Sequence, residues 1–311
     1  MAKINGKEIM RVKGMGFLFN RGTDDKFNAR IVSGNGGITA EQMSCIAKAT
    51  EKFGDGNAVF TSRMCIEIQG VAFENIEPLQ EFLAQVGLET GGTGDKIRPV
   101  VACKGNTCVF GLVPSMDVAK LIYERFYKGY RRVELPHKFK IAVGGCPNNC
   151  VKPDLNDIGL VGQNKPVVIL EKCKSCGKCL VESVCLMKAA KKGENGLIAI
   201  DANLCNGCGK CIRTCPFHCI DLREKGVNIV IGGRWGREGR KGSYLKGIYA
   251  VDDALDIIEK IILVYRDNAF KKERFADMID RIGFEKVESL ILQSNIIERK
   301  EEIIAKEIEK R

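Results

Sequence analysis

The stretch Cys205-Asn-Gly-Cys208-Gly-Lys-Cys211-Ile-Arg-Thr-Cys215-Pro216 decides how the middle of this chain folds. Its spacing is C-x2-C-x2-C-x3-C-P, in which three cysteines on one tight loop supply thiolates to one [4Fe–4S] cluster and the fourth reaches another cluster. A pair of zinc ribbons is the alternative. Zinc takes four ligands per site, however, and has no use for a third cysteine at this spacing. The stretch therefore predicts iron–sulfur clusters.

A second cysteine run lies upstream, Cys173-Lys-Ser-Cys176-Gly-Lys-Cys179, followed by Cys185. Cys185 lacks a following proline and its spacing is wider than usual. Because the fourth cysteine of each run ligates the other cluster, one set of ligands is Cys173, Cys176, Cys179 and Cys215. The other set is Cys205, Cys208, Cys211 and Cys185. We expect residues 166–222 to form an inserted bacterial-type 2[4Fe–4S] ferredoxin domain.

Cysteine is also unusually frequent: there are 15 cysteines in 311 residues, against 2 histidines. Disulfides need an oxidising compartment, and the charged start of the chain has no apolar segment to direct export. No stretch is apolar for long enough to predict a membrane span. These features predict thiolates that bind metal in the cytoplasm.

Residues 1–90 carry no cysteine cluster and are predicted to form a small α+β unit. Phe27–Val32 is a strand, and a helix follows from a capping box at Thr39 and Gln42 to Gly54. Two further strands and a helix complete the order, at Ala58–Ser62, Met64–Gln69 and Asn75–Val86. The order strand–helix–strand–strand–helix is that of a ferredoxin-like half-domain.

Four more cysteines lie in two short pairs, Cys103-Lys-Gly-Asn-Thr-Cys108 and Cys146-Pro-Asn-Asn-Cys150. Two pairs in one domain suit a third [4Fe–4S] cluster held between two loops, although two unrelated loop pairs are the alternative. We assign them to a domain formed by residues 91–165 and 223–311. Cys45, Cys65 and Cys219 receive no role and are predicted to be small buried hydrophobic residues.

The two pairs, with Gly145 before Cys146, resemble the cluster motif of the sirohaem sulfite and nitrite reductases. The ferredoxin insert makes the anaerobic, dissimilatory-type sulfite reductases the most similar branch. The first pair departs from the assimilatory enzymes in having four intervening residues. The resemblance implies an α+β fold, three [4Fe–4S] clusters and a sirohaem whose axial ligand is the thiolate of Cys150, shared with the cluster.

The resemblance also assigns substrate-binding cations. Arg30 and Arg63 match two arginines of the first half-domain, and Lys138 and Lys140 match a lysine pair on a strand that enters the site. On a strand, residues 138 and 140 share one side and Phe139 faces the other. Arginine suits binding of the substrate oxygens, and lysine suits proton delivery.

The net charge is +10, from 49 Lys and Arg against 39 Asp and Glu. Sirohaem carries eight carboxylates, and Arg234 and Arg237 are candidates to bind them; a solvated basic loop is the equal alternative. Nucleic-acid binding would also explain the charge, but the sequence has no such motif.

We therefore predict a sulfite reductase subunit that forms sulfide by six-electron reduction. Nitrite reduction to ammonium is the first alternative, and a non-catalytic iron–sulfur electron carrier is the second. The sequence has no G-x-G-x-x-G nicotinamide motif, so electrons would come from a protein that carries flavin or iron–sulfur. Lys172, Lys174, Lys178 and Lys210 would help to dock this donor, and we expect a homo-oligomer or a multi-subunit complex.

Overall fold

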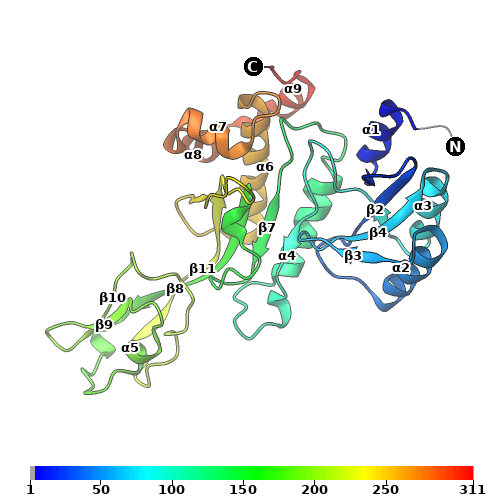
Figure 1. Ribbon diagram of the computed structural model, residues 1–311. Coiled ribbons are helices and arrows are strands. Elements are labelled where there is room, and N and C mark those ends of the chain that lie inside the picture. Colours follow the sequence, from blue (N-terminus) through cyan, green and yellow to red (C-terminus); the bar gives the residue numbers. More distant parts are fainter. Residues whose placement is uncertain (1–3, 311) are drawn as a thin grey trace. The chain divides into compact units, whose positions relative to one another are not determined.

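The computed structural model describes residues 4–310, which divide into two compact units (Figure 1). The first contains residues 4–102, 119–142 and 259–310, and the second contains 103–118 and 143–258. Both combine helices with antiparallel sheet, so the predicted α+β class is confirmed. No helix within residues 4–310 has the length and apolar character that a membrane crossing requires.

An antiparallel sheet with two covering helices forms the start of the first unit (Figure 1). Its strands run in the order β1-β2-β4-β3, and β5 pairs with β2. The elements are α1 (Gly6–Gly14), β1 (Phe17–Phe19), β2 (Lys26–Val32), α2 (Ala40–Phe53), β3 (Ala58–Phe60), β4 (Ile66–Ala72), α3 (Ile76–Ala84), β5 (Glu89–Thr90) and β6 (Val101–Ala102). The predicted order of strands and helices in this region is confirmed, with β1 and α1 as additions before it.

Local sequence signals account for α2. The Thr39 side chain accepts from the Gln42 backbone N–H and the Gln42 side chain accepts from that of Thr39, which is the predicted capping box. Gly54 ends the helix. Its buried side then packs with α3 and the sheet around Phe27, Ile68 and other apolar residues.

The first unit also contains the C-terminal helices, α7 (Phe275–Ile282), α8 (Phe284–Leu292) and α9 (Lys300–Ala305), and the end of α6 (Val251–Asn268). Phe139 is fully buried against two of these elements, with ring centroids 5.2 Å from Tyr265 and 5.4 Å from Phe275. Aromatic contacts of this kind hold the segment that carries Lys138 and Lys140.

A long two-stranded ladder organises the second unit. Strand β8 (Ile158–Val168) pairs with β11 (Ile220–Ile231), from Ile158↔Ile231 to Val168↔Ile220. The sheet order is β12-β11-β8-β7-β6. This sheet also contains β12 (Ser243–Tyr244), β7 (Ile141–Gly144) and β6. The helix α4 (Ser115–Ile122) follows β6 in the chain. The strand predicted to carry Lys138 and Lys140 thus begins only at Ile141, and Phe139 makes a single bridge to Ile97 instead.

The cysteine-rich segment is an excursion from the far end of this ladder (Figure 1). It contains α5 (Leu180–Val184), β9 (Ala190–Lys192) and β10 (Ile198–Ile200), the last two as an antiparallel pair. Its small core consists of Val181, Ala190, Ile198 and Ile220 with several cysteines. So few apolar side chains give little core, which is the situation in which small domains rely on metal.

Candidate functional site

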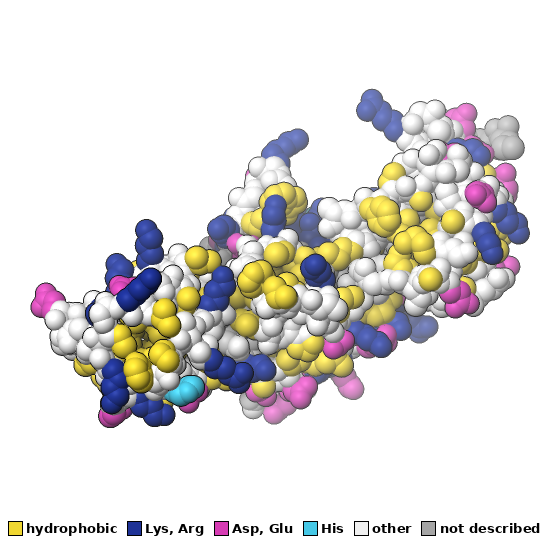
Figure 2. Space-filling model, turned by 90° about the horizontal axis from the view of Figure 1, so that it is seen from below, with side chains coloured by type: hydrophobic (Ala, Val, Ile, Leu, Met, Phe, Trp, Pro, Cys, Tyr) yellow, Lys and Arg dark blue, Asp and Glu magenta, His cyan; other side chains and the backbone are white. Residues whose placement is uncertain are grey.

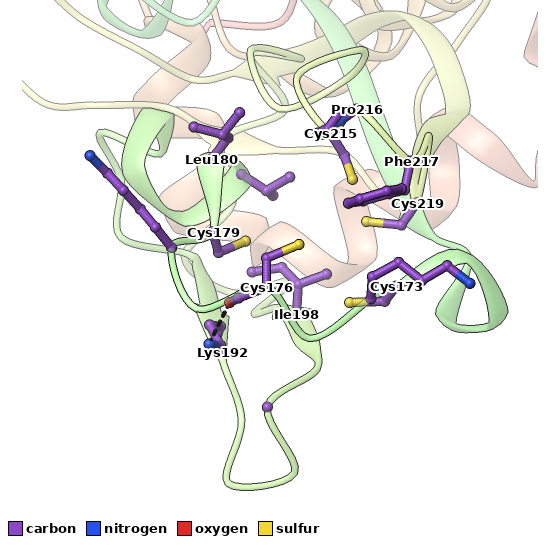
Figure 3. Close-up of a pocket in the computed structure, with 14 residues that line it drawn as sticks. Cys173, Cys176, Cys179, Leu180, Lys192, Ile198, Cys215, Pro216, Phe217 and Cys219 are labelled. Carbon is purple, nitrogen blue, oxygen red and sulfur yellow. Dashed lines mark hydrogen bonds between the residues drawn. The ribbon is translucent and has the colours of Figure 1, made fainter.

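Five cysteines point into one cavity of the excursion (Figure 3). The cavity measures about 100 Å³, and the cysteines that line it are Cys173, Cys176, Cys179, Cys215 and Cys219. Lys192 donates from Nζ to the Cys176 carbonyl oxygen at 2.8 Å and holds the loop of the first run against β9. Four of the five are the first predicted ligand set. Cys219, expected to be merely buried, also lines the cavity.

The second predicted ligand set lies together at another cavity. Its cysteines are Cys185, Cys205, Cys208 and Cys211. Burial raises the pKa of Cys211 to about 11, and its neighbours Cys205, Cys208 and Cys185 contribute to the rise. Thiols so close together resist simultaneous ionisation unless a cation compensates them, which an iron–sulfur cluster does.

Within residues 4–310, no group of three or more His, Cys, Asp or Glu side chains is arranged to hold one metal ion. Zinc bonds of about 2.3 Å would bring all four sulfurs close to one centre. An iron–sulfur cluster instead takes one thiolate at each of its irons.

The remaining two pairs, Cys103 with Cys108 and Cys146 with Cys150, also come together. Burial raises the pKa of the Cys146 thiol, and the other three cysteines add to this rise. The Gly145 backbone N–H donates to Cys103 Sγ at 3.1 Å. Cys150 is the exposed member of the group. Four convergent thiols with one exposed fit a cluster that shares a ligand with a second group.

A buried carboxylate holds the loop between Cys146 and Cys150. Asn149 has a φ of +58° and donates from Nδ2 to Asp154 Oδ1 at 2.8 Å. The backbone N–H of Gly242 donates to the Asp154 carbonyl oxygen at 2.8 Å, and Gly233 lies directly against the same backbone. The loop 232–242 therefore supports the cysteine turn. Asp154 was not predicted from the sequence, although its position four residues after Cys150 is a usable signal.

The two arginines proposed for sirohaem differ in their surroundings. Arg234 donates from Nη2 to Glu238 Oε2 at 2.7 Å and from Nε to the Glu238 carbonyl oxygen at 2.9 Å. Arg237 is exposed. Lys152 lies over the Trp235 ring, 4.4 Å from its centroid, which places another cation two residues from Cys150. To bind a carboxylate of sirohaem, Arg234 would have to release Glu238. Arg237 does not share this contact with Glu238.

The two arginines predicted to bind substrate lie in the first unit, and both have partners. Arg30 on β2 forms an ion pair with Glu67 at 2.6 Å and donates to the Gly92 carbonyl oxygen at 3.1 Å. Arg63, in the turn between β3 and β4, donates to the carbonyl oxygens of Pro99 and Ile141, both at 3.1 Å. These contacts fix the direction of each guanidinium group.

Arg98 is a further cation beside Arg30 and was not predicted from the sequence. Its Nη1 donates to the Gly92 carbonyl oxygen at 2.5 Å, the same acceptor that Arg30 uses. Burial, together with the nearby charge of Arg30, lowers the pKa of Arg98 to about 10. In the sequence, Arg98 could have been recognised by its position between the glycine-rich residues 91–94 and the strand that begins at Val101.

Lys138 and Lys140 flank the fully buried Phe139 on an extended segment, so both lysines lie on its half-buried side. Neighbouring His137 contacts Asp95 Oδ1 through Nδ1 at 2.9 Å, and Lys272 binds the other oxygen at 2.5 Å. Burial lowers the pKa of His137 despite this bond. Burial alone would raise the pKa of Asp95, but the bonds from Lys272 and His137 lower it.

Comparison with known proteins places the chain in a family. The sequence model of the nitrite and sulphite reductase 4Fe-4S domain matches residues 93–297, which is more than half of the chain. The chain belongs to the nitrite and sulphite reductase family. The model of the nitrite/sulfite reductase ferredoxin-like half domain matches residues 20–86, in the first unit.

Relatives of this nitrite and sulphite reductase chain occur in Methanocaldococcus jannaschii. The chain is 34% identical to an uncharacterised protein over 86% of its own length and 91% of that protein. It is 33% identical to the coenzyme F420-dependent sulfite reductase over 80% of its length, but it spans only 38% of that relative. A crystal structure of dissimilatory sulfite reductase I superposes with a TM-score of 0.68 at 22% identity, covering 86% of this chain and 69% of that one.

Membership of the nitrite and sulphite reductase family confirms the predicted resemblance and implies a [4Fe–4S] cluster together with sirohaem. The four thiols of Cys103, Cys108, Cys146 and Cys150 fit such a cluster, since they converge and one of them stays exposed.

Proposed function

We propose that this chain is a sirohaem sulfite reductase that converts sulfite to sulfide with six electrons. The observation that carries the proposal is the convergence of the two short cysteine pairs, with Cys150 exposed, in a member of the nitrite and sulphite reductase family. The relatives named as sulfite reductases support sulfite as the substrate.

In this proposal Cys103, Cys108, Cys146 and Cys150 bind the catalytic cluster, and the Cys150 thiolate is also the axial ligand of sirohaem. The sirohaem would supply the place where the sulfur atom of sulfite accepts electrons. Arg234 and Arg237 are proposed to bind its carboxylates, with the Glu238 contact of Arg234 as a competing partner.

The cations of the first unit would act on the substrate. Arg30 and Arg63 are held by backbone and carboxylate contacts and would bind sulfite oxygens by charge-assisted hydrogen bonds. Lys138 and Lys140 would release protons as the oxygens leave as water, since an ammonium group titrates more readily than a guanidinium group. Burial near Arg30 makes Arg98 an additional candidate for retaining the anion.

The two cysteine groups of the excursion are proposed to bind two further [4Fe–4S] clusters, which gives three in total. We retain the division into residues 1–90, 91–165 with 223–311, and an inserted ferredoxin domain at 166–222. The free cysteines and the cluster-binding chemistry also suit the cytoplasm.

The electron donor would be a flavin or iron–sulfur protein that docks on the excursion. The excursion lies at the left of Figure 2, where hydrophobic side chains are bordered by Lys and Arg. Leu180 and Phe217 are exposed beside the first cysteine cavity, and Lys174 and Lys178 lie at its edge. This combination suits a donor with an acidic face. We also propose assembly into a homo-oligomer or a multi-subunit complex.

Anaerobic purification followed by acid–acetone extraction tests the proposal. We expect the extract to show the absorption bands of a reduced isobacteriochlorin. We also expect each chain to contain twelve iron atoms from three four-iron clusters, in addition to the sirohaem iron. Clusters without the macrocycle would support a non-catalytic electron carrier instead.

Turnover with an artificial reductant then separates the substrates. Faster turnover of sulfite than of nitrite, with sulfide as the product, is expected. A clear preference for nitrite with ammonium as the product would favour nitrite reduction, which the family description also allows.

A further inference from the structure

Strand β8 and the residue that follows it contact the loops of all three cysteine groups of the second unit, at Gly162, Asn164 and Ile169. At Gly162 it meets the loop of the catalytic cysteines, because a Cβ atom there would lie 2.3 Å from the Gly145 carbonyl oxygen. The Gly145 N–H in turn donates to Cys103 Sγ. Gly162 therefore permits a close approach of two backbones that any other residue would prevent.

Two residues further on, β8 meets the loop of Cys205, Cys208 and Cys211. The Asn164 N–H donates to the Gly207 carbonyl oxygen at 2.8 Å, and Asn164 forms a parallel bridge with Cys208. Gly207 and Gly209 have φ values of +69° and +66°, and they let this loop lie flat against Gln163 and Asn164.

The group of Cys173 attaches at the end of the ladder, where the Ile169 N–H donates to the Cys219 carbonyl oxygen at 2.8 Å. A strand rises about 3.3 Å per residue. The attachment points of the first two groups are therefore roughly 7 Å apart along β8, and the third lies roughly 17 Å beyond.

A side-chain contact joins the same two loops that β8 brings together. Lys210, between Cys208 and Cys211, lies over the ring of Phe110, 5.2 Å from its centroid. Phe110 follows Cys108 by two residues. A cation over an aromatic face is a favourable contact, and here it bridges a ferredoxin-type loop and a catalytic loop.

We propose that Gly162 and the Phe110–Lys210 pair are positioning residues that set the separation between the catalytic cysteines and the Cys205 group. The group of Cys185, Cys205, Cys208 and Cys211 is then the inner of the two in the excursion, and the group of Cys173, Cys176, Cys179 and Cys215 is the outer. The inference rests on the proposed function for its cofactor content. It also moves Lys210 from the donor-docking surface to the inner contact.

The test is an electron paramagnetic resonance titration of the purified holoprotein. Loss of one ferredoxin-type signal in Cys208→Ser and of another in Cys176→Ser assigns the two groups. Lys210→Ala removes a positive charge beside the inner group, so the midpoint potential of the Cys208-dependent signal should become more negative. Phe110→Ala should slow the spin relaxation of that same signal by loosening its approach to the catalytic group.

Val109→Ala and Lys191→Ala are the matched controls, since Val109 is exposed beside Phe110 and Lys191 is an exposed lysine of β9. Gly162→Ala tests the backbone approach directly, but its Cβ would collide with Gly145, so the two side-chain variants carry the test. If Lys210→Ala and Phe110→Ala changed the Cys176-dependent signal instead, or changed neither signal, this inference would be overturned while the proposed function would stand. If the wild type lacks iron–sulfur signals, the proposed function fails as well.

Discussion

The side-chain amide of Asn149 binds the buried carboxylate of Asp154 at 2.8 Å and so ties the turn before Cys150 to the rest of the second unit. Because Asn149 is in the left-handed region, its turn depends on this anchor as well as on local geometry. Asp154 is in turn fixed by the Gly242 N–H.

Replacement of Asn149 by Ala should therefore weaken cofactor retention. Loss of the hydrogen bond leaves the Asp154 carboxylate without this donor and costs about 1–3 kcal/mol. We expect fewer iron atoms and less sirohaem per chain after gel filtration. Asn148→Ala is the control, because Asn148 is adjacent and exposed; equal retention in both variants would contradict the role of Asn149.

Glu259 should contribute a pH-dependent part of the stability of the first unit. It accepts from Tyr130 at 2.7 Å, Lys300 at 2.6 Å and Arg125 at 2.5 Å. Burial would raise its pKa, but these bonds prevail and lower the pKa to about 2, from an ordinary value of 4.5. The contribution is therefore complete above about pH 4.5 and is lost as the pH falls towards 2.

Glu259→Gln should lower the free energy of unfolding at pH 7 by roughly 1–3 kcal/mol, since both cationic partners are partly exposed. Denaturant titrations at pH 7 and pH 3.5 measure this, and the difference between wild type and variant should narrow at the lower pH. Glu301→Gln, at an exposed position of α9, is the control. A difference that is the same at both pH values would rule out the ionised carboxylate as its source.

The sequence predicted the ferredoxin-like order of the first unit and the grouping of the cysteine motifs in the second unit because those signals are local. Thr39 and Gln42 form their capping box within one helical turn, and three of four ligands in each run lie on one loop. The supports of the site could not be predicted in the same way. Arg98 shares an acceptor with Arg30, 68 positions away, and Phe110 meets Lys210 across 100 residues, so these pairs exist only after folding.

The pair Lys138 and Lys140 is predicted to deliver protons. Each replacement by Met removes the ammonium group while the buried Phe139 keeps the segment in place, so cofactor content should be unchanged. Turnover of sulfite should fall by about 10²–10⁴-fold, the usual contribution of a positioned proton donor. Steady-state assays with an artificial reductant measure this, and Lys120→Met on exposed surface is the control. Unchanged turnover would remove both lysines from the site.

Charge reversal at the outer cysteine cavity should slow reduction by an acidic protein donor. Lys174 and Lys178 are exposed at the edge of the cavity, beside the exposed Leu180. Attraction between exposed charges acts mainly on the association rate and weakens with salt. The double variant Lys174→Glu, Lys178→Glu should therefore reduce the second-order rate of reduction by about tenfold or more at low ionic strength, and less at high ionic strength.

Stopped-flow reduction by an acidic ferredoxin or flavodoxin at several salt concentrations measures the effect. Lys191→Glu, on the exposed side of β9, changes the same net charge per site away from the cavity and should have a smaller effect. Reduction by dithionite, which needs no docking surface, should be equal in all variants. If Lys191→Glu slows the protein donor as much per charge as the double variant, net charge alone governs association and the cavity edge is not the docking surface.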